Sequence, residues 1–246
     1  MYHLRKTGLL REVCLATCVL TALNTHAMGQ AVARTAKGQQ QSRNITYAPG
    51  QIDLGNSRVY VYVGKTGLGH EHGVVGRIRQ GAIQLGADQN AGQIVFDMAS
   101  FEADTAKARK YVGLNGSTEK STKRKVNANM RGPGVLDIRQ YPTALFTVRS
   151  SRPLSTKSER GFPQYRLDGK LTLHGVAQPV RITVDAEPKD GWIHLRGGFS
   201  MLQTSYGITP FSKAFGAVGI TDQLKIWGDI WIAGPRGGTV TIPSTQ

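Results

Sequence analysis

Two histidines separated by one residue, His70 and His72, are the side chains best placed in this sequence to do chemistry. Residues i and i+2 of a strand point to the same face, so both imidazole rings would lie on one side of the chain. Such a pair can ligate a metal or haem iron, with His174 or Glu71 as a third ligand, although Glu71 would alternate to the opposite face. The same pair can contact a ligand head group, or hold a glycine-rich bend through hydrogen bonds. The sequence leaves these three uses open.

Motifs typical of enzymes are absent from the sequence. There is no Gly-x-Ser-x-Gly elbow, no His-Glu-x-x-His and no P-loop. The acidic residues Asp53, Asp97 and Asp104 are scattered among expected strand and turn positions. We therefore expect a protein that is not an enzyme, and no resident metal.

The first 31 residues have the composition of an export signal. Basic residues precede an apolar run from Val13 to Leu23, and small residues follow near Ala27 and Ala31. Cleavage there would place the mature protein in the periplasm or outside the cell. Cys14 and Cys18 are the only cysteines and lie inside this segment. The mature chain would then have no disulfide and no thiol ligand.

Short runs of alternating residues dominate the rest of the chain, which is the pattern of β-strands. Arg58–Val63, for example, places three valines on one face. Expected strands are His70–Arg79, Gly81–Leu85, Gln93–Met98, Ala144–Arg149, Tyr165–His174, Val180–Ala186, Trp192–Met201 and Gln223–Ala233 as well. Residues 206–219 are expected to form a long loop between the last two strands. We expect four segments: a signal at 1–31, a flexible leader at 32–50, a barrel domain at 51–234 and a tail at 235–246.

One helix is predicted, over Thr118–Met130 and lying outside the sheet. Ser117 is its expected N-cap, Glu119 falls in its first turn, and Gly132-Pro133-Gly134 ends it. A large antiparallel sheet has exposed edges, and closure into a barrel removes them. The predicted fold is therefore all-β: an antiparallel up-and-down barrel of about eight strands with one inserted helix, and a sandwich as the alternative.

Four sequence blocks resemble the YceI-like family of secreted bacterial barrels. They are Gly67–Gly73 with Gly81–Ile83, Val135–Phe146, Leu167–Val180, and Tyr206–Ile208 with Asp222–Ile226. The resemblance extends over roughly residues 52–233. It implies a lipocalin-like barrel that binds a long isoprenoid or another amphipathic lipid, with quinone-like molecules as the first expectation. The Gly-His-Glu-His stretch resembles a subgroup with a GHxH motif, whose members can accompany membrane b-type cytochromes.

An isoprenoid tail needs an elongated apolar tube and few polar contacts. The expected ligand-binding residues are the inward candidates, the two histidines, and two aromatic residues of the 206–219 loop, which would form a rim or lid. They are Val61, Val63, His70, His72, Ile78, Phe96, Met98, Phe146, Leu171, Leu173, Phe199, Tyr206, Phe211 and Ile226. Alternation alone does not distinguish a hollow barrel from a filled core.

The chain is strongly basic, with 31 Lys and Arg against 16 Asp and Glu. Residues 105–166 hold 14 of these bases and three acids. Lys120, Lys123, Arg124 and Lys125 cluster on the predicted helix. This stretch could face an anionic membrane or an acidic protein.

Nucleic acid is not expected as a partner, because residues 112–140 lack aromatic side chains for stacking. A homodimer is compatible with the sequence. The alternatives to a lipid carrier are a metal- or haem-binding redox accessory and a solid-core module that acts through its basic face.

Overall fold

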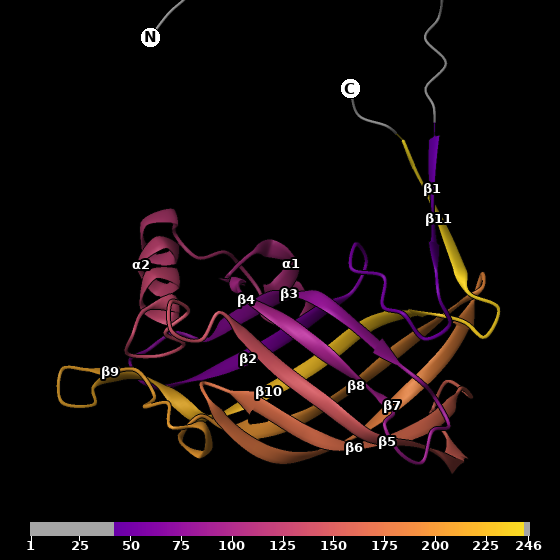
Figure 1. The fold of residues 1–246 in the computed structure, drawn as a ribbon. Helices are drawn as coiled ribbons and strands as arrows, with labels where there is room; N and C mark the ends of the chain where they lie inside the picture. The colour runs from indigo at the N-terminus through magenta and orange to yellow at the C-terminus, as the bar shows by residue number, and fades with distance from the viewer. Residues whose placement is uncertain (1–41, 244–246) are drawn as a thin grey trace, which may run out of the picture. The chain divides into compact units, whose positions relative to one another are not determined.

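Eight antiparallel strands close into a ring in the computed structural model, which describes residues 42–243 (Figure 1). The sheet order is β2, β3, β4, β5, β6, β7, β8, β10, and β10 pairs back with β2. The strands are β2 (Arg58–Gly67), β3 (His72–Ile83), β4 (Gly92–Ala103), β5 (Thr143–Lys157), β6 (Pro163–Leu173), β7 (Val176–Lys189), β8 (Trp192–Leu202) and β10 (Val218–Ala233). Closure leaves no edge of this sheet unpaired, so the prediction of an all-β antiparallel barrel is confirmed.

The expected strands His70–Arg79 and Gly81–Leu85 are one strand, β3. Gly81 indicated a turn in the sequence, but it lies inside the strand. A Cβ atom at this position would come within 2.7 Å of the Ile52 side chain and of the Gln93 carbonyl oxygen. The glycine is therefore required by close packing within a strand.

Two helices lie between β4 and β5, where one was predicted. The helix that the sequence did not predict is α1 (Ala106–Tyr111), which is short and has only Ala108 buried. The predicted helix is α2 (Lys120–Arg131). Its N-cap is Glu119 and not Ser117: the Glu119 carboxylate accepts hydrogen bonds from the backbone N–H groups of Ser121 (2.7 Å) and Thr122 (3.0 Å). Neither helix is long and apolar enough to cross a membrane.

Two further strands pair outside the ring. β1 (Ser42–Tyr47) is antiparallel to β11 (Gly238–Pro243). They fall in the segments expected to be a flexible leader and a tail, so part of each is ordered as a two-stranded ribbon. The loop expected over residues 206–219 contains the end of a 3-10 helix (Thr204–Tyr206) and the two-residue strand β9 (Ser212–Lys213), which pairs with β10. The predicted signal at 1–31 lies outside the described residues.

The register of the strands defines two ends of the barrel. We call the end that holds the last residues of β2, β4, β6 and β8 the α2 end, because α2 packs there through Val126 and Met130. The opposite, or far, end holds the first residues of these strands. Buried apolar side chains line the inside of the wall between the two ends.

Candidate ligand-binding site

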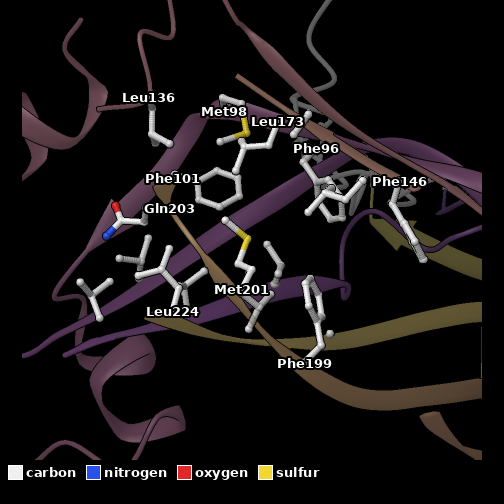
Figure 2. Close-up of a pocket in the computed structure, with 18 of the residues that line it drawn as sticks. Phe96, Met98, Phe101, Leu136, Phe146, Leu173, Phe199, Met201, Gln203 and Leu224 are labelled. Atoms are coloured by element: carbon white, nitrogen blue, oxygen red, sulfur yellow. The ribbon is translucent and has the colours of Figure 1, made fainter. Parts of the chain in front are cut away.

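The inward faces of the strands surround a cavity of about 260 Å³. Its lining is almost entirely apolar, and Figure 2 shows Phe96, Met98, Phe101, Phe199 and Met201 converging on it. Three lining residues carry polar side chains: His72, Asn129 and Gln203. His72 begins β3, Asn129 belongs to α2 and Gln203 follows β8, so all three lie at the α2 end. The cavity is amphipathic along its length.

Eleven of the fourteen residues expected at the site line this cavity. They are Val61, Val63, His72, Phe96, Met98, Phe146, Leu171, Leu173, Phe199, Phe211 and Ile226. The inward alternation of strands such as β2 brings most of them together, since Val59, Val61 and Val63 all face the cavity. The structure therefore places these eleven residues around the cavity, and their binding of a ligand stays a prediction.

Three expected residues lie elsewhere. His70 is exposed and precedes β3, so the alternation that turns His72 inward does not extend to it. Ile78 is 4% exposed and belongs to the buried core but does not line the cavity, and β3 has register shifts on either side of it. Tyr206 is buried and lines a separate hollow with Gln178, Ser205 and Gln223.

His72 is held by Asp104, a contact that the sequence did not indicate. The His72 Nδ1 atom lies 2.7 Å from Asp104 Oδ2. Asp104 is at the end of β4, with a positive φ of 58° and a side chain that is 0% exposed. Its carboxylate also accepts hydrogen bonds from Thr118 Oγ1 (2.9 Å), Arg109 Nη1 (3.2 Å) and the Gly73 amide (3.3 Å). Every oxygen of this buried carboxylate is thus satisfied.

Gly73 allows this arrangement because it brings α1 against β3. A Cβ atom at Gly73 would lie 2.9 Å from the backbone of Ala108 and Arg109. Because α1 packs so closely on β3, its residue Arg109 lies within hydrogen-bond distance of Asp104. Arg109 also donates hydrogen bonds to the carbonyl oxygens of Asn115 (2.5 Å) and Gly116 (3.1 Å). The second glycine of the Gly-His-Glu-His-Gly stretch is therefore part of the support of His72.

The remaining metal candidates do not join His72. Glu71 lies on the outer face and accepts a hydrogen bond from Tyr62. His174 and Gly175 form the two-residue turn between β6 and β7, and both have positive φ angles (51° and 76°), as a type I′ turn requires. The His174 ring packs on Tyr141, with 4.4 Å between centroids. Across residues 42–243, no three His, Cys, Asp or Glu side chains form a group suited to a metal ion.

Gln203 is the second polar residue that the sequence did not indicate. It is 3% exposed, and its Nε2 atom donates to the Thr221 carbonyl oxygen over 2.8 Å. That carbonyl is available because the β2–β10 pairing has a bulge between Ile220 and Leu224. The bulge depends on pairing between distant strands, so no local sequence signal could reveal it.

A closed antiparallel barrel with an apolar internal cavity and polar groups at one end defines the class of ligand-binding β-barrels. Residues 51–230 match the YceI-like domain, and the chain therefore belongs to the YceI-like family. No curated protein matches the sequence.

One solved structure shares this fold, and two others are similar to the chain at lower TM-scores. A polyisoprenoid binding domain from Saccharophagus degradans, implicated in plant cell wall breakdown, has a TM-score of 0.51 and 12% identity. It covers 75% of this chain and 98% of its own. BcnA from Burkholderia cenocepacia has a TM-score of 0.48 and 15% identity, covering 74% of this chain and 99% of its own. The YceI protein of Campylobacter jejuni has a TM-score of 0.39 and 9% identity. Its alignment covers 70% of this chain and 85% of the Campylobacter jejuni chain.

Proposed function

We propose that this protein binds an isoprenoid-type amphipathic lipid, with a quinone-like molecule as the leading ligand class. The observation that carries the proposal is the distribution of polarity in the cavity: apolar along the barrel, with His72, Asn129 and Gln203 at the α2 end. The tail would lie among the apolar side chains and the head group at the α2 end. The polyisoprenoid binding named for the Saccharophagus degradans domain, which shares the fold, agrees with this proposal.

The physical driving force is burial of the tail. Each methylene transferred from water contributes about 0.8 kcal/mol, so a tail of several isoprene units binds without any hydrogen bond. Polar contacts then orient the ligand and select its head group. We propose binding and not catalysis, since the polar side chains that line the described cavity include no hydroxyl, thiol, amine or carboxylate.

We further propose that the protein is exported and collects its ligand from an anionic membrane. Two large apolar side chains stand exposed on adjacent loops of the α2 end: Leu68 (81%) and Phe215 (113%). The loops are joined by a hydrogen bond from the Leu68 amide to the Ala217 carbonyl oxygen (2.9 Å). The basic cluster of α2, at Lys120, Lys123, Arg124 and Lys125, lies at the same end. Apolar anchors beside bases suit an anionic lipid surface. The GHxH resemblance adds a membrane b-type cytochrome as a proposed partner.

The ligand proposal is tested by native mass spectrometry of protein purified without detergent, followed by solvent extraction. A stoichiometric prenyl lipid is the expected result. Purified protein that contains no lipid and does not bind added quinones or prenols would overturn the proposal. That result would favour the alternative of a solid-core protein that interacts through its basic face.

Membrane docking is tested separately, by flotation with vesicles of phosphatidylglycerol or phosphatidylcholine. We expect binding to the anionic vesicles only, weakened by salt and by a double variant, Leu68→Ser with Phe215→Ser. Leu54→Ser is the control, because Leu54 is an exposed leucine (39%) that precedes β2 at the far end. Equal binding by the double variant and the control would contradict docking through the α2 end.

A further inference from the structure

The Asp104 carboxylate determines which nitrogen of His72 carries the proton. A carboxylate only accepts hydrogen bonds. Burial raises the pKa of Asp104, but the hydrogen bonds from His72, Thr118 and Arg109 outweigh it and leave the pKa below its ordinary value. Asp104 is therefore ionised at neutral pH, and the short contact with His72 Nδ1 requires the proton to be on Nδ1. In a neutral imidazole, Nε2 is then an acceptor.

Arg109 and His72 share the Asp104 carboxylate. The negative charge of Asp104 is already compensated by Arg109, whose Nη1 atom lies 3.2 Å from Asp104 Oδ1. Imidazole groups are neutral in alkaline solution, so the binding test below is set at pH 8, where a proton on Nδ1 leaves Nε2 as an acceptor. The carboxylate of Glu71 faces Tyr62 on the outer wall.

We infer that the Nε2 edge of the His72 ring faces the cavity, because His72 is a lining residue whose Nδ1 atom is bound by Asp104. His72 pairs with Val63 in the β2–β3 register and shares the inward face of β3 with Val74, and all three line the cavity. The two ring nitrogens point in divergent directions, so Nε2 points away from Asp104. Within residues 42–243, no protein group hydrogen-bonds to it.

Gln203 presents the same chemistry independently. Its amide nitrogen donates to Thr221, while its Oε1 atom makes no hydrogen bond to the described part of the chain. Figure 2 shows this amide among Phe101, Leu136 and Leu224 at the edge of the apolar cavity. Two acceptors, on His72 and Gln203, therefore remain unpaired at the α2 end.

We propose that this site selects a lipid whose head group donates a hydrogen bond to His72 Nε2, such as a prenol or a hydroquinone, with Gln203 Oε1 as a second acceptor at the same end. The inference rests on the proposed lipid-binding function and deepens it. Within the quinone-like class, the site therefore selects the reduced, hydroquinone form. The carbonyl of a quinone, like an ether oxygen, only accepts hydrogen bonds and would leave both protein acceptors unsatisfied.

The test compares two ligands that differ only in the donor: geranylgeraniol and its methyl ether, titrated at pH 8. A neutral hydrogen bond corresponds to about a three- to tenfold difference in Kd, with the prenol tighter. Decylubiquinol and decylubiquinone, a pair with one tail, then distinguish a phenolic from an alcoholic head group. Equal affinities within both pairs would overturn the inference and leave lipid binding intact, whereas failure of all four ligands to bind would overturn both.

Asp104→Asn is the sharpest variant, because it should reverse the tautomer. Asp104 Oδ1 accepts from the Gly73 amide and Arg109, which can only donate, so the oxygen of the substituted amide must stay on that side. The amide nitrogen then faces His72 and donates to Nδ1, which moves the imidazole proton to Nε2. The corresponding substitution in the catalytic triad of serine proteases also produces the wrong tautomer.

We expect Asp104→Asn to abolish or invert the preference for the prenol over its ether. Asp168→Asn is the matched control: Asp168 is also buried (6%) and bound by Arg166 and Arg181, but it does not line the cavity. The ¹⁵N shifts of the His72 ring report the tautomer directly. Wild-type protein with the proton on Nε2, or an unchanged preference in a folded Asp104→Asn variant, would refute the mechanism. If that variant does not fold, His72→Phe serves, with loss of the preference expected.

Discussion

The ring of Tyr111 in α1 stacks on the ring of Tyr60 in β2, with 3.7 Å between their centroids and 9° between their planes. Tyr60 points outward from the barrel and is 0% exposed because Tyr111 and α1 cover it. The stack fixes α1 on the outer wall, and α1 supplies Arg109 to Asp104. A contact outside the barrel thus supports the orientation of His72 inside it.

Loss of the stack should loosen α1. We expect Tyr111→Ala to lower the free energy of unfolding in urea by about 1–3 kcal/mol, since it removes a half-buried aromatic pair and exposes Tyr60. Tyr111→Phe keeps the ring and should cost much less. Equal losses in the two variants would mean that the hydroxyl, and not the stacking, holds the helix.

Tyr111 should also limit stability in alkali. Burial, followed by the charge of Asp229 and the neighbouring Tyr60, raises the pKa of Tyr111 to about 12 from an ordinary value of 10.0. Because the folded state holds this proton more tightly, the contribution is complete below pH 10 and is lost as the pH rises towards 12. We expect the free energy of unfolding to fall less steeply over this window in Tyr111→Phe. An identical slope in the wild type would contradict the raised pKa.

Two alanines distinguish a hollow barrel from a filled one. Ala144 and Ala186 are each 4% exposed, but only Ala144 lines the cavity. We expect Ala186→Leu to cost about 1–3 kcal/mol by overpacking, whereas Ala144→Leu fills empty space and costs less than about 1 kcal/mol. Urea denaturation measures both.

The same alanine variants give a second reading in ligand titrations. Ala144→Leu should weaken prenol binding, because its side chain occupies volume that the tail needs. Similar large losses of stability in both variants would indicate that the barrel is packed solid at Ala144.

The cap of α2 can be tested on the two residues that compete for the role. Hydrogen bonds from Ser121 and Thr122 lower the pKa of Glu119 to about 2. The cap therefore stabilises the helix at neutral pH and is lost only as the pH falls towards 2. We expect Glu119→Ala to shift the NMR amide signals of Ser121 and Thr122 and to speed their hydrogen exchange. Ser117→Ala should leave both unchanged, and the reverse result would restore Ser117 as the cap.

The sequence predicted what depends on local alternation and missed what depends on pairing between distant segments. Val59, Val61 and Val63 indicated an inward face, and they line the cavity. Asp104 looked like one more carboxylate at the end of a strand, and only the fold brings it to His72, 32 residues away. Gln203 depends on a bulge in another strand. Helix α1 has only six residues and no apolar stripe, so its sequence does not predict a helix. Contacts with β2 and β3 stabilise it instead.

Closure of β10 on β2 bears on the rate at which ligand is exchanged. Each strand of the ring is hydrogen-bonded on both sides, so the wall cannot part without breaking a ladder. Val126, Asn129 and Met130 of α2 line the cavity, so we expect a ligand that passes at the α2 end to displace this helix. The helix is tied to β4 by Asn127 on the Ala103 amide (2.8 Å) and by Arg131 on the Phe101 carbonyl oxygen (2.8 Å). Residence time would then depend on the opening of this helix as well as on the length of the buried tail. A membrane or protein that pulls on α2 would unload the barrel without competing for its interior.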